Sequence, residues 1–253
     1  SPGHGIMNVD VQSFVRLAFR VFSETGAGNV QVLDDLGKIM ILKKVLSNKK
    51  DDLKYFGRNI NKDGYISEIK SFMSELIQYG ADENEIEKMI QASENKTVLK
   101  YKLQDMSVAF SAFKEYIDKN YITSEELLSV FADVISQSGL LNGAVICLDG
   151  FTGFTPLQYR LLRELIKIAE KVYITVTADE RESVINKGKN YQLFFMSRKT
   201  VNNIRLIASE TGVEVLDDIW TGKEISQTRF GSSKELEWLE RNLFRYPYKR
   251  YNN

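Results

Sequence analysis

Acidic and aromatic residues follow two apolar segments that are predicted to be neighbouring β-strands. Asp149 comes directly after the run 144–148, and Asp179 comes shortly after the run 172–176. In open α/β sheets the active edge lies beyond the carboxyl ends of the strands, so Asp149 stands where an acid could hold magnesium through water. The next residue is Gly150, which has no side chain for acid–base work. Asp149 could equally be a structural residue that ends a strand.

The sequence pattern needed to hold a nucleoside triphosphate is missing. The phosphate-binding loop Gly-x-x-x-x-Gly-Lys-[Ser/Thr] does not occur in the 253 residues. We therefore predict that this chain hydrolyses no ATP itself and contains no catalytic residue. One cysteine, Cys147, and one histidine, His4, are too few for a zinc site built from these residue types, so no metal site is predicted.

Two segments are candidates for contact with nucleic acid. Phe151 and Phe154 lie in the loop after the first strand, where exposed aromatic rings could stack on bases of single-stranded DNA or could fold back as local core. Ser13, Phe14 and Arg16 open a helix, and a helix N-terminus with a hydroxyl and an Arg is a plausible phosphate contact. Alternatively, Phe14 is core and Arg16 is solvated.

The elements around these residues predict a βαβ unit with parallel strands. The run 144–148 is continuously apolar, as expected for a strand buried on both faces. Thr155, Pro156 and Gln158 form a capping-box start for the following helix. The second strand is predicted at 172–176, followed by a helix at 200–211, a short strand at 213–215 and an exposed helix at 233–244.

The rest of the chain is predicted to be helical. A strand at 6–11 leads into a helix that ends near Gly26, and from about 32 to 138 the pattern is helical without a convincing strand, including a capping box from Thr123 to Glu126. We therefore predict a discontinuous α/β domain formed by residues 1–30 and 142–253, interrupted by a helical insertion at 31–141.

Composition limits the class of protein without fixing its function. Lys plus Arg and Asp plus Glu both number 34, so the formal net charge of zero argues against a strong global field for nucleic acid. No apolar run approaches the roughly 18 residues of a membrane span, so no membrane contact is expected. The chain has one cysteine and so cannot form an intramolecular disulfide, which fits a reducing, cytoplasmic location. Both ends of the sequence suggest a piece of a larger protein.

With these residues in place, the chain resembles the helicase-like part of AddB/RexB-type proteins, the B subunits of AddAB ATP-dependent helicase/deoxyribonucleases. The resemblance spans essentially the whole chain. It is carried by the order and spacing of three segments, residues 7–22, 33–38 and 149–158, of which the last is the most specific.

The resemblance implies a degenerate fold of the superfamily 1 helicase (P-loop NTPase) class, with a parallel sheet that lacks the first strand and the phosphate loop. The same segments are similar to worn helicase motifs. Ser13 and Phe14 stand where such helicases contact single-stranded DNA, and Asp149 and Gly150 stand in a degenerate Walker B motif.

The family further implies what this chain would do and with what. It would be a non-motor region that binds the 3′-ended single strand and helps to recognise the Chi sequence in double-strand-break repair, as part of a heterodimer with an AddA-type motor protein. The resemblance implies ATP with magnesium and an iron–sulfur cluster for the parent protein, but no cofactor for these residues. Two alternatives stay open: an ATP-binding module with little or no hydrolysis, and a structural lobe that docks the motor protein.

Overall fold

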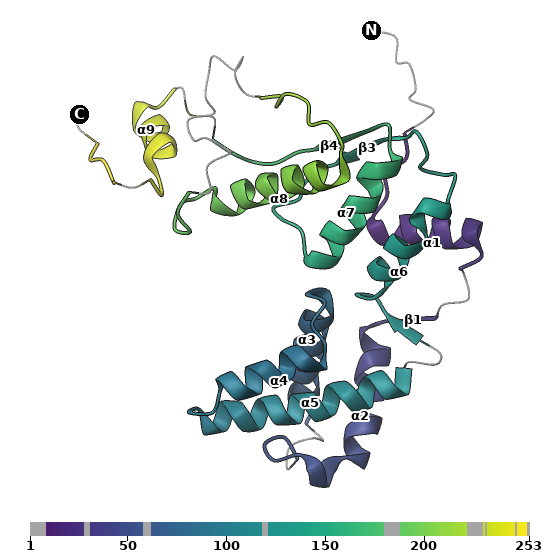
Figure 1. Cartoon of the computed structure of the whole chain (residues 1–253). Helices are drawn as coiled ribbons and strands as arrows, with labels where there is room; N and C mark the ends of the chain where they lie inside the picture. Colours follow the sequence, from purple (N-terminus) through teal and green to yellow (C-terminus); the bar gives the residue numbers. More distant parts are fainter. Residues whose placement is uncertain are drawn as a thin grey trace. The chain divides into compact units, whose positions relative to one another are not determined.

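The computed structural model describes residues 9–27, 31–57, 62–117, 121–179, 188–221, 230, 232–245 and 247–251. These residues form two compact units (Figure 1). Unit 1 holds residues 1–142 and 155–164, and unit 2 holds residues 143–154 and 165–253. The predicted strand at 6–11 lies in part outside the described residues, and residues 9–11 are not a strand.

Unit 1 begins with a helix pair. Helix α1 (Phe14–Thr25) starts at the N-cap Ser13 and ends at Gly26, whose φ of 77° is the left-handed conformation that glycine adopts without strain. The start and end agree with the sequence prediction. Helix α1 packs on α6 (Leu127–Val134), which is followed by the 3₁₀ turn η2 (Ile135–Gln137). Phe22 and Phe131 meet edge to face in this contact, with ring centroids 6.4 Å apart.

The main core of unit 1 lies within a bundle of four helices. These are α2 (Asp35–Asn48), α3 (Asp63–Gln78), α4 (Glu83–Ala92) and α5 (Thr97–Ile117), with the 3₁₀ turn η1 (Lys50–Asp52) after α2. Helix α5 contacts each of the other three helices (Figure 1). Phe56, Ile66, Ile86 and Phe113 are among the fully buried side chains, so this bundle carries most of the apolar burial.

Contrary to the prediction of a strand-free insertion, two strands connect to this bundle. Strand β1 (Gln31–Leu33) pairs in parallel with β2 (Tyr121–Thr123), and Val32 lies opposite Ile122. Each strand has only three residues, which is too short to show a period-of-two pattern in the sequence. Their pairing joins segments far apart in the chain, so no local signal could reveal it.

Unit 2 contains the predicted pair of parallel strands. Strand β3 (Val145–Leu148) pairs with β4 (Lys171–Ile174), and the two are joined through α7 (Pro156–Ile168). The strand–helix–strand order and the parallel pairing therefore agree with the sequence. Helix α7 begins in unit 1, and its residues from Leu165 belong to unit 2.

The prediction that β3 is buried on both faces is wrong. Burial alternates along the strand, and Val145 is 55% exposed while Leu148 is buried. Within the described residues β3 has one paired neighbour, β4, and both strands have four residues. A two-stranded sheet gives a strand little cover, so an apolar run does not guarantee two buried faces here.

The remainder of unit 2 is helical. Helix α8 (Phe195–Thr211) covers the predicted helix at 200–211 and begins earlier, and α9 (Lys234–Asn242) is exposed as predicted. The strand predicted at 213–215 is absent, since these described residues have no regular secondary structure and are exposed. The Val213 amide instead donates to the Ala208 carbonyl at 2.9 Å, so it is used to end α8 after Gly212 rather than to pair with a strand.

The fold is therefore α/β with short parallel sheets and a large helical part. The predicted domain boundaries at residues 30 and 141 stay a prediction. The compact units do separate near residue 142, and helix α1 belongs to unit 1, where it packs on α6. Among the described helices, none is long and apolar enough to cross a membrane.

Candidate nucleic-acid interface

The loop that follows β3 carries a stacked pair of aromatic rings. We call residues 149–154 the aromatic loop. The rings of Phe151 and Phe154 lie nearly parallel, with an interplanar angle of 25° and a centroid distance of 4.9 Å. Both side chains are half-buried, and Thr152 between them is exposed. The pair is thus neither core nor fully solvated, and it lies at the carboxyl end of a parallel strand as the sequence predicted.

Asp149 and Gly150 shape the start of this loop. The Asp149 carboxylate accepts a hydrogen bond from the Thr175 hydroxyl, and the Thr175 amide donates to the Leu148 carbonyl at 2.9 Å. Gly150 has a φ of 79°. A side chain at this position would be strained by about 1–2 kcal/mol, so the backbone conformation itself favours glycine here.

Ser13, Phe14 and Arg16 lie together at the beginning of α1 in unit 1. The Ser13 hydroxyl accepts a hydrogen bond from the Arg16 amide at 3.3 Å, as an N-cap does. The first turn, residues 14–17, has no acidic residue, so the positive end of the helix dipole is not offset there. Phe14 is half-buried and Arg16 is exposed.

Two arginines one turn apart on α1 differ in their partners. Arg20 forms an ion pair with Asp10. In the part of the chain that the structure describes, no carboxylate pairs with the Arg16 guanidinium, which leaves its N–H donors available to a phosphate. The predicted contact residues thus form two separate groups, one on α1 and one in the aromatic loop. Their roles remain predictions.

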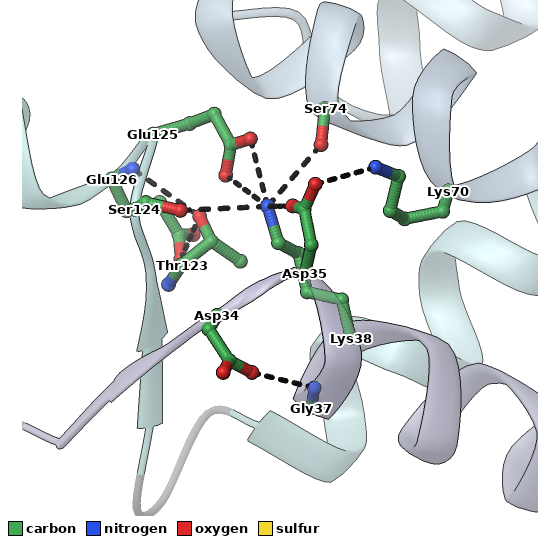
Figure 2. Close-up of polar contacts among 10 residues, drawn as sticks. All are labelled: Asp34, Asp35, Gly37, Lys38, Lys70, Ser74, Thr123, Ser124, Glu125 and Glu126. Atoms are coloured by element: carbon green, nitrogen blue, oxygen red, sulfur yellow. Dashed lines mark hydrogen bonds and ion pairs between the residues drawn. The ribbon is translucent and has the colours of Figure 1, made fainter. Parts of the chain in front are cut away.

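A buried ion network that the sequence pattern did not reveal surrounds Lys38 on α2, with partners from α3 and from the segment after β2 (Figure 2). Lys38 on α2 is only 3% exposed. Its ammonium donates to the two carboxylate oxygens of Glu125 at 2.9 and 3.1 Å and lies 3.0 Å from a carboxylate oxygen of Asp35. The hydroxyls of Ser74 and Ser124 are more distant, at 3.4 and 3.5 Å. We call these five residues the Lys38 network.

The network holds its charged groups ionised. Burial opposes the charge of Lys38, but hydrogen bonds to Glu125 and Asp35 outweigh it and raise the pKa of the ammonium. Burial likewise opposes ionisation of Glu125, and the hydrogen bond from Lys38 helps to lower the pKa of that carboxyl overall. Hydrogen bonds from Lys70 and then Lys38 lower the pKa of Asp35.

The Lys38 network links the segment that enters the bundle after β1 with the segment that follows β2. Strand β1 leads into α2 through the N-cap Asp34, and Lys38 lies in the first turns of that helix. The Asp34 carboxylate accepts a hydrogen bond from the Gly37 amide at 2.7 Å (Figure 2). Glu125 follows β2. The reciprocal bonds of the predicted capping box are present, since the Thr123 amide donates to Glu126 at 2.9 Å and the Glu126 amide donates to the Thr123 hydroxyl at 3.2 Å, but α6 begins only at Leu127. The only hint of this network in the sequence is a lysine, Lys38, at a position of α2 that faces the core.

The residues present do not fit the cofactors that the resemblance implies for the parent protein. An iron–sulfur cluster requires several thiolates, and the chain has one cysteine. Asp149 is hydrogen-bonded to a hydroxyl, and its neighbour Gly150 adds no second carboxylate. In the described residues no group of three His, Cys, Asp or Glu side chains could hold a metal ion.

These features define a helix-rich α/β protein with an exposed N-terminal helical turn and an aromatic loop at the end of a parallel strand. A family model described as "ADDB, N-terminal" matches residues 1–240. The chain therefore belongs to the AddB family.

Curated relatives match the chain over nearly all of its length. The relative from Lachnoclostridium phytofermentans is 43% identical over 252 residues, which is 99% of this chain and 22% of that protein. The relative from Clostridium novyi is 34% identical over 250 residues, also 99% of this chain and 22% of that protein. Each is named as the B subunit of an ATP-dependent helicase/deoxyribonuclease. The chain spans about a fifth of the length of these relatives.

Proposed function

We propose that this chain is the non-motor, helicase-like region of the B subunit of a DNA end-processing helicase–nuclease. In this role it binds the 3′-ended single strand and contributes to Chi recognition during double-strand-break repair in the cytoplasm. The relatives' shared name, which combines helicase and deoxyribonuclease activity, supports a DNA substrate. Their designation as one subunit of a complex supports a partner, which we take to be an AddA-type motor protein.

The stacked pair of Phe151 and Phe154 is the observation that carries this proposal. Two half-buried rings at the carboxyl end of β3 provide an apolar surface on a loop rather than in the core. Stacking of bases on aromatic rings contributes about 1–3 kcal/mol per base and tolerates any sequence. As a separate contact, a DNA phosphate would bind at the start of α1, where Arg16 and the helix N-terminus supply donors.

The test is equilibrium binding of a labelled single strand to the full-length protein that carries this chain. Phe151→Ala with Phe154→Ala should weaken binding by roughly tenfold or more. Tyr173→Ala is the matched control, because Tyr173 is an exposed aromatic residue of β4 in the same unit. Equal affinities for the two variants and the wild type would contradict the proposal. Repeating the comparison with strands that contain or lack Chi tests the sequence preference.

The ATP-binding alternative makes a different prediction. If the degenerate motif were a working site that lacks only its catalytic acid, Gly150→Glu would raise ATP hydrolysis. We expect no gain, because a side chain is strained at a φ of 79° and no phosphate loop occurs in these residues. The docking-lobe alternative predicts that neither Phe151 nor Arg16 affects DNA binding.

A further inference from the structure

A second surface of unit 1 combines lysines and tyrosines in a fixed arrangement. We call Lys54, Tyr55, Tyr101 and Lys102 the lysine–tyrosine patch. The Lys54 ammonium lies 5.6 Å from the centroid of the Tyr101 ring, and the Lys102 ammonium lies 4.9 Å from the centroid of the Tyr55 ring. The two cation–π contacts therefore cross between the loop after η1 and the first turns of α5.

A buried carboxylate holds this loop in place. Asp105 on α5 is 1% exposed, and its oxygens accept hydrogen bonds from the amides of Lys54, Tyr55 and Phe56 at 2.8, 2.7 and 2.8 Å. Three N–H donors on one carboxylate compensate for burying its charge. The buried Asp105 carboxylate thus fixes the backbone of an exposed loop.

The neighbours of the loop add to its rigidity. Phe56 is fully buried and meets the Tyr55 ring edge to face, with centroids 5.0 Å apart. A Cβ at Gly57 would lie 2.8 Å from the Leu53 carbonyl oxygen, so the chain turns too tightly for any other residue. Tyr55 and Tyr101 nevertheless remain 37% and 42% exposed. The rings are presented on the surface rather than packed away.

The charge near the patch is asymmetric, with Asp51 and Asp52 before Lys54 in η1 and lysines at the beginning of α5. Residues 96–104 include three lysines, Lys96, Lys100 and Lys102, and no acidic residue. Glu68 approaches Lys102 at 3.7 Å, and Lys54 donates to Gln104 at 3.0 Å. A surface Lys–Tyr contact contributes only about 0.5–1 kcal/mol, so these pairs are weak enough for the lysines to exchange a ring for a phosphate.

We propose that the lysine–tyrosine patch is a second binding surface for single-stranded DNA, with phosphates on Lys54 and Lys102 and unpaired bases stacked on Tyr55 and Tyr101. Moving each lysine from its ring to a phosphate uncovers a ring face for a base. Duplex DNA hides its bases, so the exposed ring faces favour the single strand. This proposal rests on the proposed function only in taking DNA as the ligand.

The test is photocrosslinking of the full-length protein to a bromouracil-containing single strand, with adducts located by mass spectrometry. We expect adducts on Tyr55 or Tyr101. Lys54→Gln with Lys102→Gln should lower their yield by roughly fivefold or more and reduce the salt slope of binding by about 1.4, at about 0.7 per phosphate. Lys88→Gln is the control, because it removes an exposed lysine of α4 that pairs with Glu85.

The position of the adducts separates the two proposals. Adducts confined to α1 or the aromatic loop would overturn the patch and leave the proposed function standing. Adducts on the patch alone would support the patch and count against the aromatic loop. Complete absence of adducts would overturn both. Equal adduct yields with single-stranded and duplex DNA would overturn the stacking of unpaired bases on the tyrosines.

Discussion

The α2–α5 bundle and the α/β part of unit 2 bury their residues in contrasting ways. The bundle has a continuous apolar core and also buries charges, Lys38 with Glu125 and Asp105 with three backbone amides. The strands of unit 2 alternate between half-buried or buried and exposed residues, and α9 has no buried residue among those described. The bundle thus has a closed apolar core, while the strands of unit 2 leave apolar residues such as Val145 and Tyr173 exposed.

The largest expected effect is on the Lys38 network. Lys38→Met leaves the Glu125 carboxylate without its main partner in a half-buried site, and it should lower the free energy of unfolding by about 3–5 kcal/mol. Urea unfolding measures this. Lys88→Met, at an exposed position of α4, should cost less than about 1 kcal/mol.

A double variant distinguishes charge burial from simple loss of packing. Lys38→Met with Glu125→Leu removes both charges and should recover most of the lost stability. Recovery would show that the unpaired carboxylate causes the damage. A double variant as unstable as Lys38→Met alone would show instead that the bundle depends on the ion pair itself.

The same network predicts a pH dependence. Glu125 has a lowered pKa in the folded protein, so its contribution to stability is present above its ordinary pKa of 4.5 and is lost as pH falls through the lower folded value. Between about pH 7 and about pH 3.5, the wild type should therefore lose more stability than Glu125→Gln. Parallel pH profiles for the two proteins would contradict this assignment. Asp35 is exposed and should add little.

A smaller effect compares two glycines that share a conformation but lie in different units. Gly26 and Gly150 have φ values of 77° and 79°, and a Cβ at either position meets no atom within 4 Å. Gly26→Ala and Gly150→Ala should each lower stability by about 1 kcal/mol through backbone strain. Only Gly150→Ala should also weaken single-strand binding, because it alters the start of the aromatic loop. Equal binding by both variants would show that the loop geometry has no role.

Local sequence signals were sufficient for much of this fold. Ser13 and Gly26 delimit α1, and the predicted capping box at Thr155 is observed, with the Thr155 amide donating to Gln158 at 2.8 Å. Such contacts lie within three or four residues, so the sequence contains both partners side by side. The parallel pairing of β3 with β4 followed from their separation by one helix.

Features that depend on distant partners were missed. Strands β1 and β2 are recognised only through each other, and the exposure of Val145 depends on how many strands and helices surround β3. The position of Asp105 on α5 gave no hint that it would bind residues 54–56. The sequence left open whether Phe151 and Phe154 are exposed or folded back as local core, and the stacking of the two half-buried rings on each other had no local signal.

Contact between the beginning of α1 and a DNA phosphate, which is part of the proposed function, can be tested by comparing Arg16→Gln with Arg20→Gln. Both changes remove one positive charge from exposed positions one turn apart, but Arg20 is paired with Asp10. The measurement is the salt dependence of single-strand binding by the full-length protein. We predict that Arg16→Gln alone reduces the slope by about 0.7, the value for one phosphate. Identical slopes for the two variants would contradict a phosphate contact at Arg16.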